Sequence, residues 1–174
     1  KRLFDEWGAA PTFVFERQPK AVQSNNGGGP IAVDTKFSIT VVNTFAEDEP
    51  LECVLDAARR LPDVQFYITG DLKKSDKAVV ASAPSNCQFT GYLYGNDYWD
   101  LLKKSRAVMA LTTWNNSLIM AGQDGIALNK PTLISRQETT AEYFTKGVVL
   151  VDNTGESIAG GITEVQRIAA AASM

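Results

Sequence analysis

Short apolar runs alternate with longer amphipathic stretches along most of the chain, from Phe37 to its end. Within the runs, apolar residues predominate and do not alternate strictly with polar ones, which is typical of strands buried on both faces of a sheet. The pattern predicts strands at 37–43, 64–70, 87–91, 107–112, 131–135 and 148–151. Between and after the strands it predicts helices at 50–61, 75–83, 97–105, 117–128, 138–145 and 156–172.

Residues with strong local preferences indicate where several of these helices begin and end. Pro50 suits the first turn of its helix, because proline has no amide hydrogen to place there. Asn96 is the expected N-cap of helix 97–105, and Asn116 or Ser117 is the expected N-cap of helix 117–128. Asn129 can adopt the left-handed conformation that ends this helix.

A strict alternation of strand and helix indicates a parallel sheet that helices cover on both faces. Because strand-helix-strand crossovers are right-handed, the pattern favours a doubly wound, Rossmann-like sheet with strand order 3-2-1-4-5-6. We therefore expect an α/β fold of three layers, α/β/α, over residues 37–174.

The first 36 residues lack this regularity. The stretch 1–7 has a helical pattern, 12–16 can form a short strand, and the rest up to residue 36 is rich in Gly, Pro and polar residues. Three consecutive glycines at 27–29 precede a strand, whereas a phosphate-binding loop follows a strand and opens a helix. We interpret 1–36 as the end of a preceding segment followed by a linker, in a fragment of a larger protein.

Composition excludes several classes of function. The chain of 174 residues has a net charge of −3, so no positive field favours nucleic acid or an anionic membrane. It contains no His, which removes the usual catalytic triads and His-containing metal sites. No apolar run approaches the ~18 residues that a membrane span requires. Cys53 and Cys87 lack metal-binding spacing, so we expect both to be reduced, buried thiols. Reduced thiols fit a cytoplasmic protein, and association of that protein with a membrane surface stays open.

A sheet of this type binds ligands beyond the carboxyl ends of its strands, where the strand order reverses. The loops at that edge are "NTFAEDE", "GDLKK", "GYLYGN" and "TTWNNS". The first loop has no GxGxxG fingerprint and the chain has no Walker motif, which argues against NAD binding and ATP hydrolysis. The candidate ligand-binding residues in the first, second and fourth loops are Asn43, Thr44, Gly70, Lys73 and Trp114.

The fourth loop leads into a helix whose N-terminus is a candidate anion site. Free amides near Leu118 and Ile119 would point out of it, and the helix dipole adds roughly 0.3–1 kcal/mol for an anion. Asp124, further along the helix, offers a hydrogen-bond acceptor suited to a vicinal diol such as that of a ribose. An ordinary capped helix facing water, with Asp124 solvated, is the alternative.

From "FSITVVNTF" to the last helix, the chain resembles the C-terminal, donor-binding domain of GT-B glycosyltransferases. It is most similar to the retaining, family 4-like group that includes sucrose synthases and bacterial capsule and lipopolysaccharide transferases. That group often carries a Glu-x7-Glu motif followed by Gly-Lys-Pro. Aligning Lys130 and Pro131 with the end of that motif places Asp124 at the second Glu and Asn116 at the first.

The resemblance implies a role for each aligned position. Asp124 would accept hydrogen bonds from the ribose of a nucleotide-diphosphate sugar, and Asn116 would take the catalytic position beside the transferred sugar. Amides around Ser117 and Leu118 would meet the diphosphate, while the base would lie near Gly91, Tyr92 and Leu93. The resemblance also implies a glycosyltransferase that needs no metal or other cofactor. An N-terminal acceptor-binding domain would complete it, so the isolated domain is expected to be inactive.

One loop departs from the resemblance. Where relatives place Arg and Lys after the first strand, this chain has Glu47, Asp48 and Glu49. A carboxylate ~8 Å from a phosphate charge costs about 0.5 kcal/mol in water and ~2 kcal/mol at an effective dielectric constant of 20. We expect the three carboxylates to point outward, towards the N-terminus of helix 50–61. The positive charges of Lys73 and Lys74 are a second way to offset the repulsion between these carboxylates and a diphosphate. The alternatives are a scaffold domain that has lost donor binding and a nucleotide-sugar epimerase.

Overall fold

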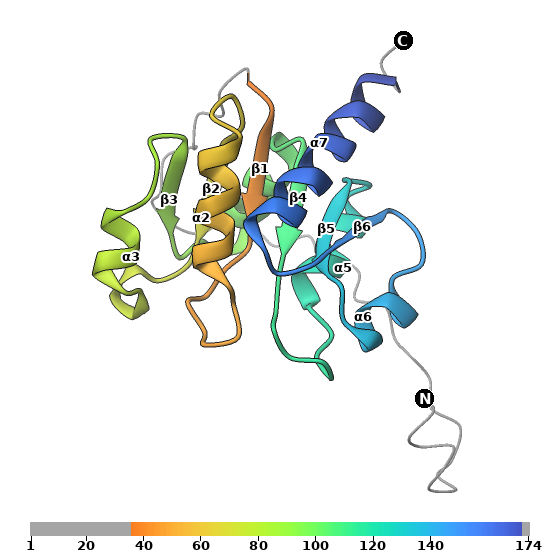
Figure 1. Ribbon diagram of the computed structural model, residues 1–174, viewed down its shortest axis with the longest axis horizontal. Coiled ribbons are helices and arrows are strands. Elements are labelled where there is room, and N and C mark those ends of the chain that lie inside the picture. Colours follow the sequence, from red (N-terminus) through yellow and green to blue (C-terminus); the bar gives the residue numbers. More distant parts are fainter. Residues whose placement is uncertain (1–35, 172–174) are drawn as a thin grey trace, which may run out of the picture.

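The computed structural model describes residues 36–171. In this part of the chain, strands and helices alternate throughout (Figure 1). The strands are β1 (Ser38–Val41), β2 (Gln65–Thr69), β3 (Cys87–Gly91), β4 (Ala107–Ala110), β5 (Thr132–Ser135) and β6 (Val148–Val151). The helices are α2 (Leu51–Arg60), α3 (Lys77–Ala81), α4 (Gly95–Lys104), α5 (Met120–Ala127), α6 (Glu138–Tyr143) and α7 (Gly155–Ala171), with a 3-10 turn η1 (Leu72–Lys74).

All strand pairs in the sheet are parallel, and the strand order is β3-β2-β1-β4-β5-β6. The predicted doubly wound fold is therefore confirmed, including the reversal of strand order between β1 and β4. The predicted helix at 1–7, strand at 12–16 and linker up to residue 35 lie outside the described residues.

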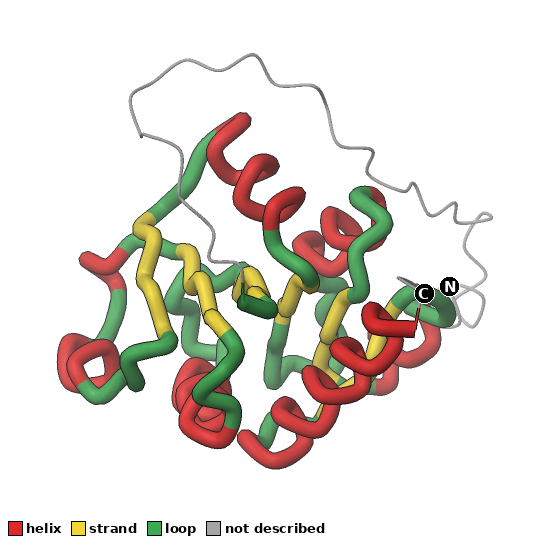
Figure 2. The backbone as a smooth tube through the Cα atoms, turned by 90° about the horizontal axis from the view of Figure 1, so that it is seen from above, coloured by secondary structure: helices red, strands yellow, loops and turns green. Residues whose placement is uncertain are grey.

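Helices cover both faces of the sheet, as the apolar strands require (Figure 2). On one face α2 and α7 pack against each other, and the core beneath them includes Ile39, Phe66 and Met109. On the other face Val108, the neighbour of Met109 in β4, packs against Trp99 and Leu102 of α4. Adjacent strand residues thus point into opposite layers, which fixes the register of β4 firmly.

Two predicted helix starts are wrong. Helix α4 begins at Gly95 with Tyr94 as its N-cap residue, so Asn96 lies inside the helix. Gly95 has a φ of +50°, a conformation that glycine adopts readily, and the chain therefore turns before it reaches Asn96.

Helix α5 begins at Met120, after Ile119, with no side-chain cap. Asn116 and Ser117 therefore do not cap it. Ile119 is extended and half-buried, a conformation that suits its β-branched side chain. Asn129 has a φ of +54° just beyond the helix, which confirms its predicted left-handed conformation.

Candidate functional site

A cleft of about 480 Å³ lies at the carboxyl edge of the sheet, between the ends of β1 and β4. The loops after β1, β2 and β3 form one side of it, and helix α4 and the start of α5 also line it. It brings together seven of the residues predicted from sequence, namely Asn43, Thr44, Gly70, Tyr92, Leu93, Ile119 and Asp124. The cleft therefore occupies the edge of the sheet that the topology rule indicates.

Asp124 lines the cleft from helix α5 and is only 4% exposed. Its Oδ2 accepts a hydrogen bond of 2.9 Å from the Tyr98 hydroxyl, which belongs to α4. Helix α5 thus presents a carboxylate that faces the cleft and is oriented by a second helix. The alternative interpretation of Asp124 as a solvated surface residue is wrong.

The loop after β1 wraps around the carboxylate of Glu49, which also lines the cleft. The Thr44 amide donates to Glu49 Oε2 at 2.7 Å, the Thr44 hydroxyl at 3.1 Å and the Ala46 amide at 3.0 Å. Phe45, between them, has a φ of +61°, which turns the flanking amides towards one point. Such a concave arrangement of amides is an anion-binding nest.

Asp48 turns in the other direction, towards β4. Its carboxylate accepts a hydrogen bond from the Thr112 hydroxyl, and its backbone carbonyl accepts one of 2.8 Å from the Thr113 amide. The expectation that the carboxylates point outward is therefore wrong for Asp48 and Glu49, while Glu47 is exposed. Nearby amides and a hydroxyl are stronger partners for these carboxylates than the more distant dipole of α2.

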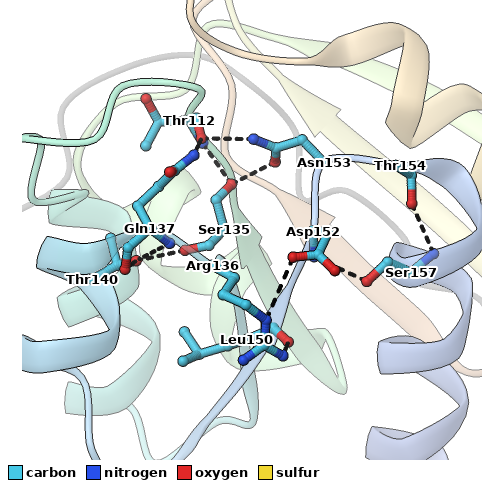
Figure 3. A network of polar contacts seen from close by, with 10 residues as sticks. All are labelled: Thr112, Ser135, Arg136, Gln137, Thr140, Leu150, Asp152, Asn153, Thr154 and Ser157. Atoms are coloured by element: carbon cyan, nitrogen blue, oxygen red, sulfur yellow. Dashed lines mark hydrogen bonds and ion pairs between the residues drawn. The ribbon is translucent and has the colours of Figure 1, made fainter.

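Thr112 also joins a polar network that ties β4 to β5 and β6 (Figure 3). Its amide donates to Ser135 Oγ at 2.9 Å, and its carbonyl accepts from Asn153 Nδ2 at 2.9 Å and Gln137 Nε2 at 3.3 Å. Ser135 Oγ donates in turn to Asn153 Oδ1 at 2.6 Å. Because Asp48 bonds to Thr112, this network fixes the loop after β1 to the middle of the sheet.

The other predicted site residues do not line the cleft. Lys73 is exposed in η1, and Gly91 is the last residue of β3, where its carbonyl accepts a hydrogen bond of 3.0 Å from the Gly70 amide. The remaining four lie in the loop before α5, where Ser117 is half-buried and the others are exposed: Trp114, Asn116, Ser117 and Leu118.

Among the polar residues that line the cleft, sequence reasoning missed Tyr98 and expected Glu49 to point away from the cleft. The position of Tyr98, four residues before the buried Leu102, places it on the inner face of α4, and this spacing could have indicated it. No comparable signal marks Glu49, because its role depends on the loop conformation.

No protein-family model matches the chain, and no curated protein matches it. Solved structures with a similar fold do match it. A glycosyltransferase from Rickettsia africae ESF-5 is 16% identical over 78% of this chain and 39% of that chain, with a TM-score of 0.62. Anabaena HepE in complex with UDP-glucose is 13% identical over 75% of this chain and 39% of that chain, with a TM-score of 0.63. The fold is glycosyltransferase-like.

The same fold also occurs in a putative UDP-N-acetylglucosamine 2-epimerase from Listeria monocytogenes. That structure is 14% identical over 77% of this chain and 37% of that chain, with a TM-score of 0.56. The present chain thus spans about two-fifths of the length of these structures, so its likeness to them concerns the fold of that part.

Within residues 36–171, the ionisable acidic side chains that line the cleft are not balanced by basic ones. Among the described residues that line it, Glu49 and Asp124 carry charge and none is Lys or Arg. Lys130 lies in a separate groove beside Gly147, where its ammonium donates to the Lys103 carbonyl at 2.6 Å. Burial, and secondarily the charge of Arg106, lowers the pKa of Lys130.

Neither cysteine lines the cleft, and both are free and half-buried rather than fully buried as expected. Burial raises the pKa of Cys87 to about 12. Burial, followed by the charges of Glu52 and Asp56, also raises the pKa of Cys53. Both thiols are therefore protonated at neutral pH and are poor nucleophiles.

Residues 36–171 contain no group of three or more His, Cys, Asp or Glu side chains placed to hold a metal ion. In the same part of the chain, no helix has the length and apolar character that crossing a membrane requires.

Proposed function

We propose that the chain is the donor-binding half of a retaining GT-B glycosyltransferase, and that its cleft binds a nucleotide-diphosphate sugar. The observation that carries the proposal is the position of Asp124. A buried carboxylate faces the cleft from helix α5, at the reversal point of a doubly wound sheet. Carboxylate oxygens are suitable acceptors for the two hydroxyls of a ribose.

The surrounding residues support a pose for such a donor. With its ribose on Asp124, the base would lie against Tyr92 and Leu93, and the diphosphate would face the first amides of α5, at Met120 and Ala121. These amides replace those near Leu118 and Ile119, because α5 begins later than predicted. HepE, which has a similar fold, was solved with UDP-glucose.

The proposed chemistry needs few groups from this half. In retaining transfer the acceptor oxygen bonds to the anomeric carbon as the bond from that carbon to the diphosphate oxygen breaks. The acceptor proton passes to the leaving diphosphate. Asn116 would contact the transferred sugar from the exposed loop before α5, and a separate acceptor-binding domain would complete the site. The chain alone would therefore bind donor without turning it over.

The proposal predicts that a nucleotide-diphosphate sugar raises the melting temperature of the chain. A ligand at 100 times its Kd adds about 2.7 kcal/mol of stability. For a domain of this size that corresponds to a rise of roughly 5–10 °C. A fluorimetric melting panel of UDP- and GDP-sugars measures it, with the free sugars as controls. A panel in which no nucleotide sugar shifts the melting temperature would favour a scaffold function instead.

The scaffold alternative rests on the charges of the cleft. Glu49 fills the nest after β1, and no described lining residue is a cation that could neutralise a diphosphate.

An epimerase is a further candidate, because the Listeria protein has a similar fold. Product analysis of a protein in which this chain is joined to an acceptor-binding domain would separate a transferase from an epimerase, since an epimerase needs no acceptor.

A further inference from the structure

The loop after β1 binds the carboxylate of Glu49 as it would bind the anionic group of a ligand. Two backbone amides and one hydroxyl converge on a single carboxylate oxygen, at 2.7, 3.0 and 3.1 Å. We propose that Glu49 is an internal anion that occupies a phosphate-binding position in the loop after β1 and thereby limits the affinity of the cleft for diphosphates. This inference rests on the proposed function, because it concerns how the same cleft receives its ligand.

The nest is built by residues other than Glu49. The amide of Phe45 donates to Asn43 Oδ1 at 2.8 Å, and the amide of Asn43 donates to Thr69 Oγ1 at 3.1 Å. The Phe45 ring lies 6.4 Å from that of Phe89, between ring centroids, and it closely covers Gly70. The loop therefore has supports that stay in place when the carboxylate is removed, and its amides then face the cleft.

The charged residues that line the cleft support the same inference. Glu49 and Asp124 are the charged residues among the described lining, so a diphosphate entering the cleft meets two carboxylates and no cation. The Asp124 carboxylate is needed for the ribose under the proposed function. Glu49 is therefore the charge whose removal should favour the diphosphate part of a ligand and leave the nucleoside part unaffected.

The chain provides a matched control for this effect. Glu47 is in the same loop, two residues away, and carries the same charge, but it is exposed and does not line the cleft. Glu47→Gln therefore changes the net charge as Glu49→Gln does, but leaves the Glu49 carboxylate in the nest. Glu49→Gln keeps an oxygen that can accept from Thr44 and Ala46, while Glu49→Ala opens the nest entirely.

The test is calorimetric titration of the chain and the three variants with UDP, GDP, uridine, guanosine and inorganic pyrophosphate. Glu49→Ala is expected to bind the recognised nucleoside diphosphate about 10- to 30-fold more tightly than the unmodified chain, because it loses a nearby like charge and opens the nest. Glu49→Gln loses the charge but still fills the nest, so its gain in affinity is expected to be smaller. Nucleoside affinity is expected to stay within about twofold, and so is diphosphate affinity in Glu47→Gln. Melting curves confirm that each variant is folded.

The outcomes separate this inference from the proposed function. If nucleoside diphosphates bind the unmodified chain and the Glu49 variants equally, or if Glu47→Gln has the same effect as Glu49→Gln, the inference is wrong and the proposed function stands. If no nucleotide or nucleoside binds any form, the proposed function fails. Pyrophosphate then decides the inference: binding to Glu49→Ala alone supports the nest, and equal behaviour of all forms overturns it.

Discussion

Replacing Asp124 by alanine is expected to weaken the binding of UDP or GDP, whichever the chain recognises, by about 10- to 150-fold. This range corresponds to ~1.5–3 kcal/mol for hydrogen bonds to a charged group. Asp124 is 4% exposed and is oriented by Tyr98, so water cannot easily replace it as an acceptor. Isothermal titration calorimetry on the chain and on Asp124→Ala measures the difference directly.

Ligand chemistry makes this prediction specific to the ribose. The 2′-deoxy form of the recognised nucleoside diphosphate lacks one hydroxyl of the diol, so the unmodified chain should bind it more weakly than the ribose form. Asp124→Ala should bind both forms alike. Tyr98→Phe, which keeps the carboxylate and removes the hydroxyl that orients it, should show a smaller loss. Full affinity and full ribose preference in Asp124→Ala would contradict the assignment.

Replacing Gly125, the neighbour of Asp124, by alanine is expected to lower the free energy of unfolding by about 2–3 kcal/mol. A Cβ at this position would lie 3.1 Å from Val108 Cβ and closer still to Thr132 Oγ1. Val108 and Thr132 are both fully buried, on strands β4 and β5, so neither side chain can withdraw. Such overpacking typically costs 1–3 kcal/mol, and here it would push α5 away from the sheet.

Gly160 provides the control for this substitution, because it is also inside a helix, α7. Apart from the adjacent residues and the backbone of its own helix, no atom lies within 4 Å of a Cβ built there. Gly160→Ala is therefore expected to raise the free energy of unfolding by roughly 0.5–1 kcal/mol, through the better helix propensity of alanine. Urea denaturation of both variants measures the two changes. Equal stability of Gly125→Ala and the unmodified chain would show that α5 does not pack as closely as described.

The strands and their order could be predicted from the sequence because both depend on general rules. Runs such as "AVMALT" are apolar on both faces and belong in a central sheet, and the handedness of crossovers then sets the strand order. Helix starts were harder to predict. Asn96 and Asn116 have the right local preferences, but the positive φ of Gly95 and the extended, half-buried Ile119 determine where α4 and α5 begin.

Some residues of the cleft could be predicted from the sequence, and others could not. Asn43, Gly70 and Leu93 follow strand ends, so topology alone brings them to one edge. The inward direction of Glu49 could not be predicted from its sequence neighbours, because it depends on the φ of Phe45 and the convergence of the Thr44 and Ala46 amides. The hydrogen bond between Tyr98 and Asp124 joins two helices through residues that are 26 apart in the sequence, and no local pattern indicates it.

The central claim is that the cleft between the ends of β1 and β4 binds a nucleotide-diphosphate sugar. Amide chemical-shift mapping of the ¹⁵N-labelled chain, titrated with UDP-glucose and a GDP-sugar, tests it most directly. The account predicts saturable shifts at Gly70, Leu93 and Ala121, and none in the groove around Lys130 and Gly147. Saturable shifts centred on that second groove, or no shifts with any nucleotide sugar, would contradict it.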